Sequence, residues 1–297
     1  MPRFPSIVVG GTFDGLHAGH RRLLQEAFHH GRRVGIGLTT DSLVRASPGK
    51  GSGVAPYSRR LRQLRAWLTS HYPEDRWFVV PLSTPEGSTL EPKVRTIAVS
   101  EETAGVAHRT NLVRRRRGLP PMDLVIVGTL YGEDLLPIAS RRIRAGLIDG
   151  EGRRRKPLTI GWQDPKTAAL GGPLLSALSE AIPEVKIRPQ SRDAEYRVSL
   201  VTSQRSLRLA MEDSLGGRLE ATVRGGWSPF LPTGRPGRAQ IEGVLPQLVF
   251  EALLPRWLSR ERILPASFVL PGGHPPAPGA GEWNRKVYSG PGIFPLE

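Results

Sequence analysis

A short segment near the N-terminus, in which an apolar strand leads through two glycines into a helix with two histidines, most constrains the fold of this chain. Residues 6–9 form an apolar run that is typical of a buried strand. Gly10 and Gly11 end that strand and let the backbone approach a ligand closely. A helix is predicted to begin near His20, and His17 stands three residues earlier, so both imidazoles can face one site. Because a helix N-terminus carries free N–H groups and a positive dipole end, the segment predicts an anion site.

Composition narrows the class of ligand that such a site could hold. The chain has no cysteine, which excludes disulfides, thiolate metal sites and cysteine nucleophiles. Zinc is disfavoured because no third ligand follows the two histidines at a suitable spacing. The net charge is +15, and residues 1–156 carry most of it, with 26 basic and 14 acidic residues. A positive field concentrates anions, so a nucleic acid backbone or a small polyphosphate is the expected ligand.

Strand-like and helical stretches alternate through the first half of the chain. The predicted strands are residues 6–9, 33–39, 76–81, 96–100 and 123–127, and the predicted helices are residues 20–30, 58–70 and 105–117. Strands separated by helices pair in parallel through crossover connections. The pattern therefore predicts an α/β fold with a parallel sheet in a first domain over residues 1–156.

The second half has a different composition and a less regular pattern. Residues 150–157 resemble a surface linker, and residues 157–195 are expected to form a linker or helical connection with one helix near 174–181. Residues 196–297 are expected to form a smaller α/β or irregular C-terminal domain. It would open with a strand at 196–201 and a helix at 207–215.

The sequence also gives expectations about location. No run reaches about 18 apolar residues, so no membrane span is expected. The N-terminus shows no secretory signal pattern. A soluble, cytoplasmic protein is therefore expected, and the oligomeric state is left open.

The histidine segment resembles the signature of a superfamily of enzymes. Residues 10–20 read Gly-Gly-Thr-Phe-Asp-Gly-Leu-His-Ala-Gly-His, and the last four resemble the (T/H)xGH signature of nucleotidyltransferases. Members of that superfamily have a Rossmann-like parallel sheet that binds a nucleoside triphosphate at the C-terminal ends of its strands. The resemblance implies such a nucleotidyltransferase domain here.

Three further segments indicate one branch of that superfamily. Residues 97–105 (IAVSEETAG), followed by Asn111 and Arg114, resemble the VSEET…N..R motif of archaeal and eukaryotic-type phosphopantetheine adenylyltransferases. Residues 138–152 resemble that family's ISSTxIR..EID.EG motif. The family's T-S-D…K…R stretch is matched by Thr40, Asp41, Lys50, Tyr57 and Arg60. The resemblance covers about residues 6–152.

The resemblance implies transfer of AMP from ATP to 4′-phosphopantetheine, which gives dephospho-CoA and pyrophosphate in coenzyme A biosynthesis. The expected catalytic residues are His20, Lys50 and Arg142. His20 would contact the α- and β-phosphates, Lys50 would bridge the attacking phosphate and the α-phosphate, and Arg142 would clamp the outer phosphates. Mg²⁺ is expected as a cofactor held mainly by the ATP phosphates, with no metal ligand from the protein.

The same resemblance implies a set of residues that bind the two substrates. His17 would hold the β- and γ-phosphates, Thr12 would position the attacking phosphate, and residues 100–103 would line the adenosine pocket. The expected binding residues are Gly10, Gly11, Thr12, Phe13, Asp14, His17, Ser100, Glu101, Glu102, Thr103, Asn111, Arg114, Ser140 and Arg144.

The chain departs from the family motif at three positions. Ala139 and Arg141 stand where the motif has a serine and a threonine, and Leu147 stands where an acidic residue often precedes Ile-Asp. Arg141 would either replace the missing hydroxyls with a charged donor or point to solvent. Residues 198–206 faintly resemble the opening of nucleoside triphosphate pyrophosphatases, so a degenerate domain of that kind is one interpretation of the second half.

Other functions remain open at this point. A nicotinamide mononucleotide adenylyltransferase or a cytidylyltransferase of the same superfamily is one alternative. A basic, non-enzymatic RNA-binding protein is the other, with residues 114–117 and 153–156 as its basic clusters. The basic clusters lack interleaved aromatic residues, which makes nucleic acid an unlikely partner.

Overall fold

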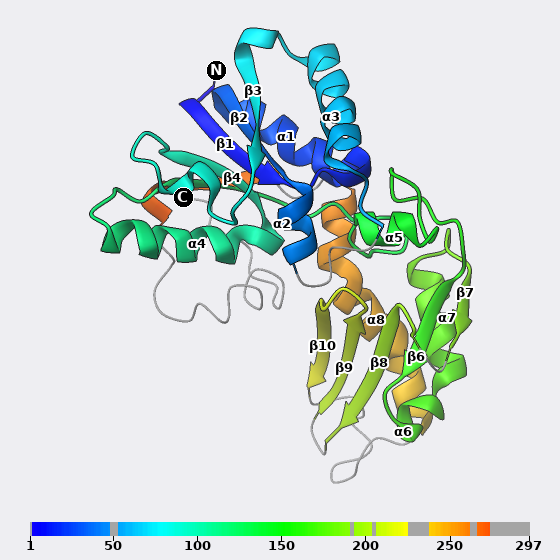
Figure 1. Cartoon of the computed structure of the whole chain (residues 1–297). Coiled ribbons are helices and arrows are strands. Elements are labelled where there is room, and N and C mark those ends of the chain that lie inside the picture. The colour runs from blue at the N-terminus through cyan, green and yellow to red at the C-terminus, as the bar shows by residue number, and fades with distance from the viewer. Residues whose placement is uncertain are drawn as a thin grey trace.

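The computed structural model describes residues 2–47, 53–190, 193–203, 206–224, 238–261 and 266–273. Its strands form two separate sheets, one of six strands and one of five. The first sheet and its helices lie at one end of the molecule and the second sheet at the other (Figure 1). Within the described residues no helix is both long and apolar enough to cross a bilayer. The cytoplasmic location expected from the sequence stays a prediction.

The first sheet has the parallel topology that the alternating pattern predicted. Its order is β11-β5-β4-β1-β2-β3, and all neighbouring strands except β11 and β5 pair in parallel. The strands are β1 (Phe4–Gly11), β2 (Gly31–Thr39), β3 (Trp77–Leu82), β4 (Thr96–Ser100), β5 (Asp123–Val127) and β11 (Ser267–Leu270). The Rossmann-like α/β fold expected for the first half is confirmed.

Helices connect these strands and bury apolar faces against them. They are α1 (Ala18–His30), α2 (Asp41–Ala46), α3 (Tyr57–His71), α4 (Glu101–Arg116) and α5 (Ser140–Arg144). Short 3₁₀ turns lie at η1 (Asp14–Leu16), η2 (Glu74–Arg76) and η3 (Gly87–Leu90). Helix α1 buries Leu24, Ala27 and Phe28 in a core that also contains Ile7 and Val9 of β1. This spacing of three and four residues is the one read from the sequence.

The second sheet has the order β10-β9-β8-β6-β7. Its strands are β6 (Leu158–Trp162), β7 (Ile187–Pro189), β8 (Tyr196–Thr202), β9 (Ser206–Asp213) and β10 (Arg218–Arg224), and its helices are α6 (Pro165–Ala168), α7 (Gly171–Ala181) and α8 (Arg238–Arg260). We call these elements the second unit. Residues 157–195 are not a linker, because β6 pairs with both β7 and β8 inside this sheet.

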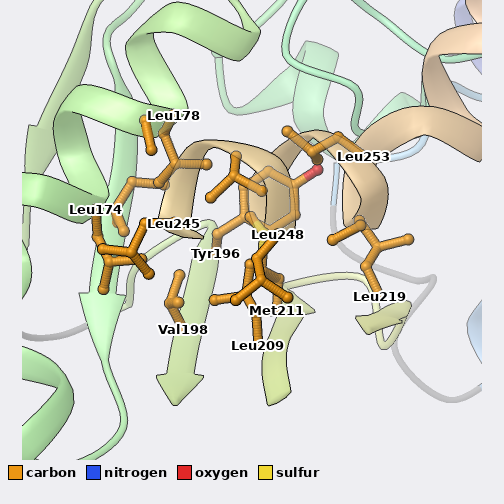
Figure 2. Close-up of a cluster of buried hydrophobic side chains, with 14 of the residues drawn as sticks. Leu174, Leu178, Tyr196, Val198, Leu209, Met211, Leu219, Leu245, Leu248 and Leu253 are labelled. Atoms are coloured by element: carbon orange, nitrogen blue, oxygen red, sulfur yellow. The ribbon is translucent and has the colours of Figure 1, made fainter. Parts of the chain in front are cut away.

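The core of the second unit lies between the sheet and helices α7 and α8. Figure 2 shows leucines of α7 and α8 gathered around strand side chains such as Tyr196, Val198 and Met211. The helix expected at residues 207–215 is the strand β9, in which Leu207, Leu209 and Met211 are buried while Arg208 is exposed. This period of two is that of a strand with one buried face. The strand–helix opening that suggested a pyrophosphatase-like domain is therefore not formed.

The chain returns to the first sheet after the second unit. Helix α8 runs from the second sheet toward the first (Figure 1), where Ser259 Oγ donates to the Thr129 carbonyl at 2.8 Å. Strand β11 then pairs antiparallel with β5. The expected C-terminal domain over residues 196–297 is therefore divided, since its last described strand completes the first sheet.

Candidate active site

The site lies where the direction of the first sheet's connections changes. Strands β1 and β4 are parallel neighbours, with Val8 opposite Ile97. The chain passes from β1 to β2 on one side of β1, whereas β4 lies on the other side. Helices α1 and α4 follow β1 and β4, so both helices begin at the same edge of the sheet. In open α/β sheets this switch point forms the crevice in which ligands bind.

The two histidines face each other at the beginning of α1. His17 is the N-cap residue and its side chain makes no capping hydrogen bond. The imidazole of His17 stacks on that of His20 with a centroid distance of 3.8 Å. Among the described residues neither Nδ1 atom has a hydrogen-bond partner, although both atoms are buried. Buried polar atoms are nearly always paired, so these two nitrogens point to a ligand.

Both imidazoles are neutral at pH 7. The pKa of His17 is lowered to about 4, by burial first and by the positive Arg21 second, while Asp14 opposes the change. The pKa of His20 lies well below its ordinary value, because of burial and then because of His17 and Arg21. A neutral imidazole has one N–H donor and can bind an anionic oxygen without carrying a charge.

The glycines of this segment make room for the aromatic side chains of the turn. Phe13 is fully buried and has a positive φ of 47°. A Cβ on Gly11 would lie 3.0 Å from the Phe13 ring, and one on Gly19 would lie 3.3 Å from the His17 ring. A Cβ on Gly10 would have ordinary room, with Leu82 at 3.6 Å. Phe13 and Gly11 therefore shape the turn through packing, and Phe13 brings no polar group to a ligand.

Asp14 connects the histidine turn to the segment around α5. Its Oδ2 accepts from Arg144 Nη1 at 2.5 Å, and its carbonyl oxygen accepts from Ser140 Oγ at 2.9 Å. Its Oδ1 accepts from the Ala55 amide at 3.2 Å. The structure therefore brings Asp14, Ser140 and Arg144 together beside the histidines, as the sequence predicted for residues of one site.

Arg60 holds Thr12 in place and was not among the expected site residues. Its guanidinium is fully buried and donates to the carbonyl oxygens of Thr12 at 3.0 Å and Ala55 at 2.7 Å. It also pairs with Asp41 at 2.9 Å. The only sequence signal was its place in the stretch from Thr40 to Arg60. The expected residue Lys50 lies in the same stretch but outside the described residues.

The beginning of α4 lies on the other side of the switch point from the histidine turn. Ser100 Oγ lies 3.0 Å from Thr103 Oγ1, and Glu101 Oε2 accepts from the Thr129 amide at 3.0 Å. Glu102 and Thr103 are exposed. These residues end β4 and open α4, which places them at the same edge of the sheet as the histidine turn.

Arg142 is a correction to the expected catalytic set. Its guanidinium is buried and donates to Asp134 Oδ2 and to the Pro137 carbonyl at 2.9 Å, with Glu195 Oε1 at 3.5 Å. These partners compensate its charge, because a buried guanidinium is stable only when it is paired. Arg142 therefore holds the chain together away from the histidines and does not clamp phosphates.

Asn111 and Arg114 are likewise structural residues. Asn111 is buried, donates to the Met122 carbonyl at 2.9 Å and accepts from the Met122 amide at 2.8 Å. Arg114 is fully buried and donates to the carbonyl oxygens of Pro120 at 2.9 Å and Val94 at 2.9 Å, with further bonds to those of Thr89 and Glu91. Both side chains hold the loops around α4 in place. At these two positions the family motif therefore reflects a structural requirement of the fold.

No group of three or more histidine or acidic residues placed to hold a metal ion occurs in the described part of the chain. The donors at the switch point are imidazoles, hydroxyls, backbone amides and guanidinium groups. This chemistry suits an anion with several oxygens, such as a polyphosphate.

Comparison with known proteins agrees with this site. Residues 8–128 match the family model described as cytidylyltransferase-like. The chain is 43% identical over 151 residues to the phosphopantetheine adenylyltransferase of Methanopyrus kandleri, a match that covers 50% of this chain and 95% of that protein. It is 39% identical over 159 residues to that of Pyrococcus horikoshii, covering 53% and 99%. A bifunctional phosphopantetheine adenylyltransferase/NTP phosphatase of Thermoplasma volcanium matches at 37% over 164 residues, covering 55% of this chain and 49% of that protein. The chain belongs to the phosphopantetheine adenylyltransferase family.

Proposed function

We propose that this protein transfers AMP from ATP to 4′-phosphopantetheine and releases pyrophosphate, a step of coenzyme A biosynthesis. Membership of the family supports the reaction. The observation that carries the assignment to this site is the pair of buried Nδ1 atoms at the beginning of α1 that have no hydrogen-bond partner among the residues the structure describes. They lie at the switch point of the sheet, where a triphosphate would also meet the free N–H groups of the helix.

The reaction needs no covalent intermediate with the protein. A phosphate oxygen of 4′-phosphopantetheine attacks the α-phosphorus of ATP, the bond from that phosphorus to the bridging oxygen of the β-phosphate breaks, and pyrophosphate leaves. Catalysis then depends on aligning the two phosphates and stabilising the charge that develops on the transferred group. His20, which is partly exposed, would donate its N–H to an α- or β-phosphate oxygen. His17 would do the same for the outer phosphates.

Other residues of the crevice would position the two substrates. Arg60 holds the Thr12 carbonyl, and the hydroxyl of Thr12 would position the attacking phosphate. Arg144 is partly exposed and paired with Asp14, so it can contribute charge to the outer phosphates. The residues from Ser100 to Thr103 would line the adenosine pocket. The role of Lys50 as a bridge between the two phosphates stays a prediction.

We propose that Mg²⁺ accompanies ATP. The ion prefers oxygen ligands and commonly keeps most of its contacts to substrate phosphates and water. The donor set of the histidine turn fits that arrangement, since the carboxylate of Asp14 is already paired with Arg144. The ion would screen the phosphate charge as the two anionic substrates approach, while the imidazoles and backbone amides orient the oxygens.

A substrate panel tests the proposal. The purified protein is incubated with ATP or CTP and with 4′-phosphopantetheine, nicotinamide mononucleotide or glycerol 3-phosphate, and pyrophosphate release is measured. Dephospho-CoA, identified by mass spectrometry, is expected from ATP with 4′-phosphopantetheine alone. Turnover with another pair would assign the chain to a different transferase. No turnover with any pair, together with RNA affinity that falls steeply with salt, would indicate a basic RNA-binding protein.

A further inference from the structure

Helix α5 lies between the histidine turn and the second unit. On one side it contacts Asp14 through Ser140 and Arg144. On the other side Arg141 Nη2 donates to the Ser214 carbonyl at 3.2 Å, in the turn between β9 and β10. A displacement of α5 would therefore move partners of Asp14, which packs against the histidines.

A buried group of four charged side chains fastens the segment around α5 to the second unit. It consists of Asp134, Arg142, Arg154 and Glu195. Arg154 Nη1 lies 2.7 Å from Asp134 Oδ2 and 2.8 Å from Glu195 Oε1. Arg142 pairs with both Asp134 and Glu195. Glu195 directly precedes β8, and its carbonyl accepts from the Ser214 amide at 2.9 Å. Ser214, which contacts Arg141 of α5, and Glu195, which contacts Arg142 of α5, are thus hydrogen-bonded to each other.

A second buried network holds the loop that leads to α5. Arg256 of α8 pairs with Asp213 at 2.5 Å and donates to the Leu135 carbonyl at 3.2 Å. The hydroxyl of Tyr196 donates to the same carbonyl at 3.1 Å. The side chain of Leu135 itself lies in the core of the second unit. The segment from Leu135 to Arg154 is therefore fastened to the second unit at both ends, while its middle carries residues of the site.

This arrangement accounts for one departure from the family motif. Arg141 stands where the motif has a hydroxyl residue, and although it is exposed, it donates to the Ser214 carbonyl of the second unit. Arg142, two residues before Arg144, points into the charged group. Two successive side chains of α5 are thus directed to the second unit, while Ser140 and Arg144 keep their contacts to Asp14.

We infer that the second unit positions the triphosphate site, with Arg141 and Glu195 as the positioning residues that connect it to α5. The inference rests on the proposed function, because the reaction that the second unit would affect is the proposed AMP transfer. The second unit would hold α5 so that Ser140 and Arg144 keep Asp14 in place and the two imidazoles stay in the geometry that receives the phosphates.

The first test is Arg141→Ala, because Arg141 is exposed and its loss should not unfold the chain. The matched control is Arg116→Ala, an exposed arginine at the end of α4 far from the crevice. In Arg141→Ala, kcat/KM is expected to fall about tenfold, as a small misplacement of reacting groups would cause, with the melting temperature unchanged. Arg141→Lys, which can still donate to the Ser214 carbonyl, should restore most of the activity.

Two further measurements test the inference independently of which reaction the protein catalyses. The ring signals of His17 and His20 in NMR spectra should shift in Arg141→Ala and not in Arg116→Ala, whichever reaction the protein catalyses. Glu195→Gln should shift the same signals. Unchanged ring signals together with unchanged kcat/KM in Arg141→Ala would overturn the inference. Absence of AMP transfer in the unmodified protein would overturn the proposed function alone.

Discussion

The histidine turn and the charged group around Arg142 both bury polar side chains, but they differ in how those side chains are paired. In the turn, the Nδ1 atoms of His17 and His20 have no partner within the described chain. In the charged group, Asp134 and Glu195 compensate the charges of Arg142 and Arg154, although Arg142 Nε has no partner within the described chain. A neutral imidazole left unpaired can bind a ligand, whereas a guanidinium whose charge is compensated stabilises the fold. The sequence motif alone placed Arg142 and His20 in the same catalytic set, and the compensation of the Arg142 charge separates them.

The largest expected effect is on stability, from Arg142→Ala. Removal of this guanidinium leaves two buried carboxylates to share Arg154, and breaking a buried ion pair costs about 3–5 kcal/mol. The free energy of unfolding, measured with urea, should fall by that amount. Arg62→Ala on the exposed side of α3 serves as the control and should change stability little. An Arg142 that clamped phosphates would give the opposite pattern, with kcat lowered and stability unchanged.

The next effect is on catalysis, from His20→Ala. Loss of one donor that stabilises the transition state costs about 2.7–4 kcal/mol, so kcat should fall about 100-fold or more. Stability should change little, because the removed nitrogen has no partner in the described protein. His29→Ala, at the other end of α1, is the control because that side chain is exposed. A normal kcat in His20→Ala would remove His20 from the mechanism.

The pKa of His17 predicts how stability depends on pH. The folded value is about 4 against an ordinary value of 6.5, so between these pH values the unfolded chain binds more protons. The free energy of unfolding should therefore rise from pH 4 to pH 6.5, with about 3 kcal/mol of the rise from His17 and a further part from His20, whose pKa is lowered too. The measurement is a series of denaturant titrations at different pH values. His17→Ala should flatten the rise, and an unchanged slope would show that another group causes it.

A contact is easier to predict from the sequence when its residues lie close together along the chain. The histidine turn was predictable because strand, glycines and helix follow each other within residues 4–30, so local rules apply. Asn111, Arg114 and Arg142 lie in the right motifs, but a motif does not state whether a side chain faces a ligand or a backbone carbonyl. The link between Arg154 and Glu195 depends on a fold that brings these distant positions together.

The strand β9 shows the other source of error. Its residues Leu207 to Asp213 include leucine, alanine, methionine and glutamate, which favour helices when considered locally. The pairing of β9 with β8 on one side and β10 on the other outweighs that preference. Leu207, Leu209 and Met211 recur at every second position and are buried, a period of two that is typical of a strand.

The smallest expected effect comes from comparing two glycines at the same helix position, one beside the candidate site and one elsewhere in the chain. Gly19 is the second residue of α1, and Gly172 is the second residue of α7. A Cβ on Gly172 meets nothing within 4 Å, so Gly172→Ala should stabilise the chain by about 0.5–1 kcal/mol through helix propensity. A Cβ on Gly19 would press on the His17 ring at 3.3 Å.

Gly19→Ala should therefore gain less stability than Gly172→Ala and should raise KM for ATP roughly two- to fivefold, because the His17 ring must move away from its stacked position. Gly172→Ala should leave KM unchanged. Thermal unfolding and steady-state kinetics on the two variants measure both quantities. If Gly19→Ala gained the full stability of its control and kept KM, the ring of His17 would have room to move without loss. The stacking of the two imidazoles would then be a consequence of packing, and the unpaired nitrogens would be the only feature of the turn on which ATP binding depends.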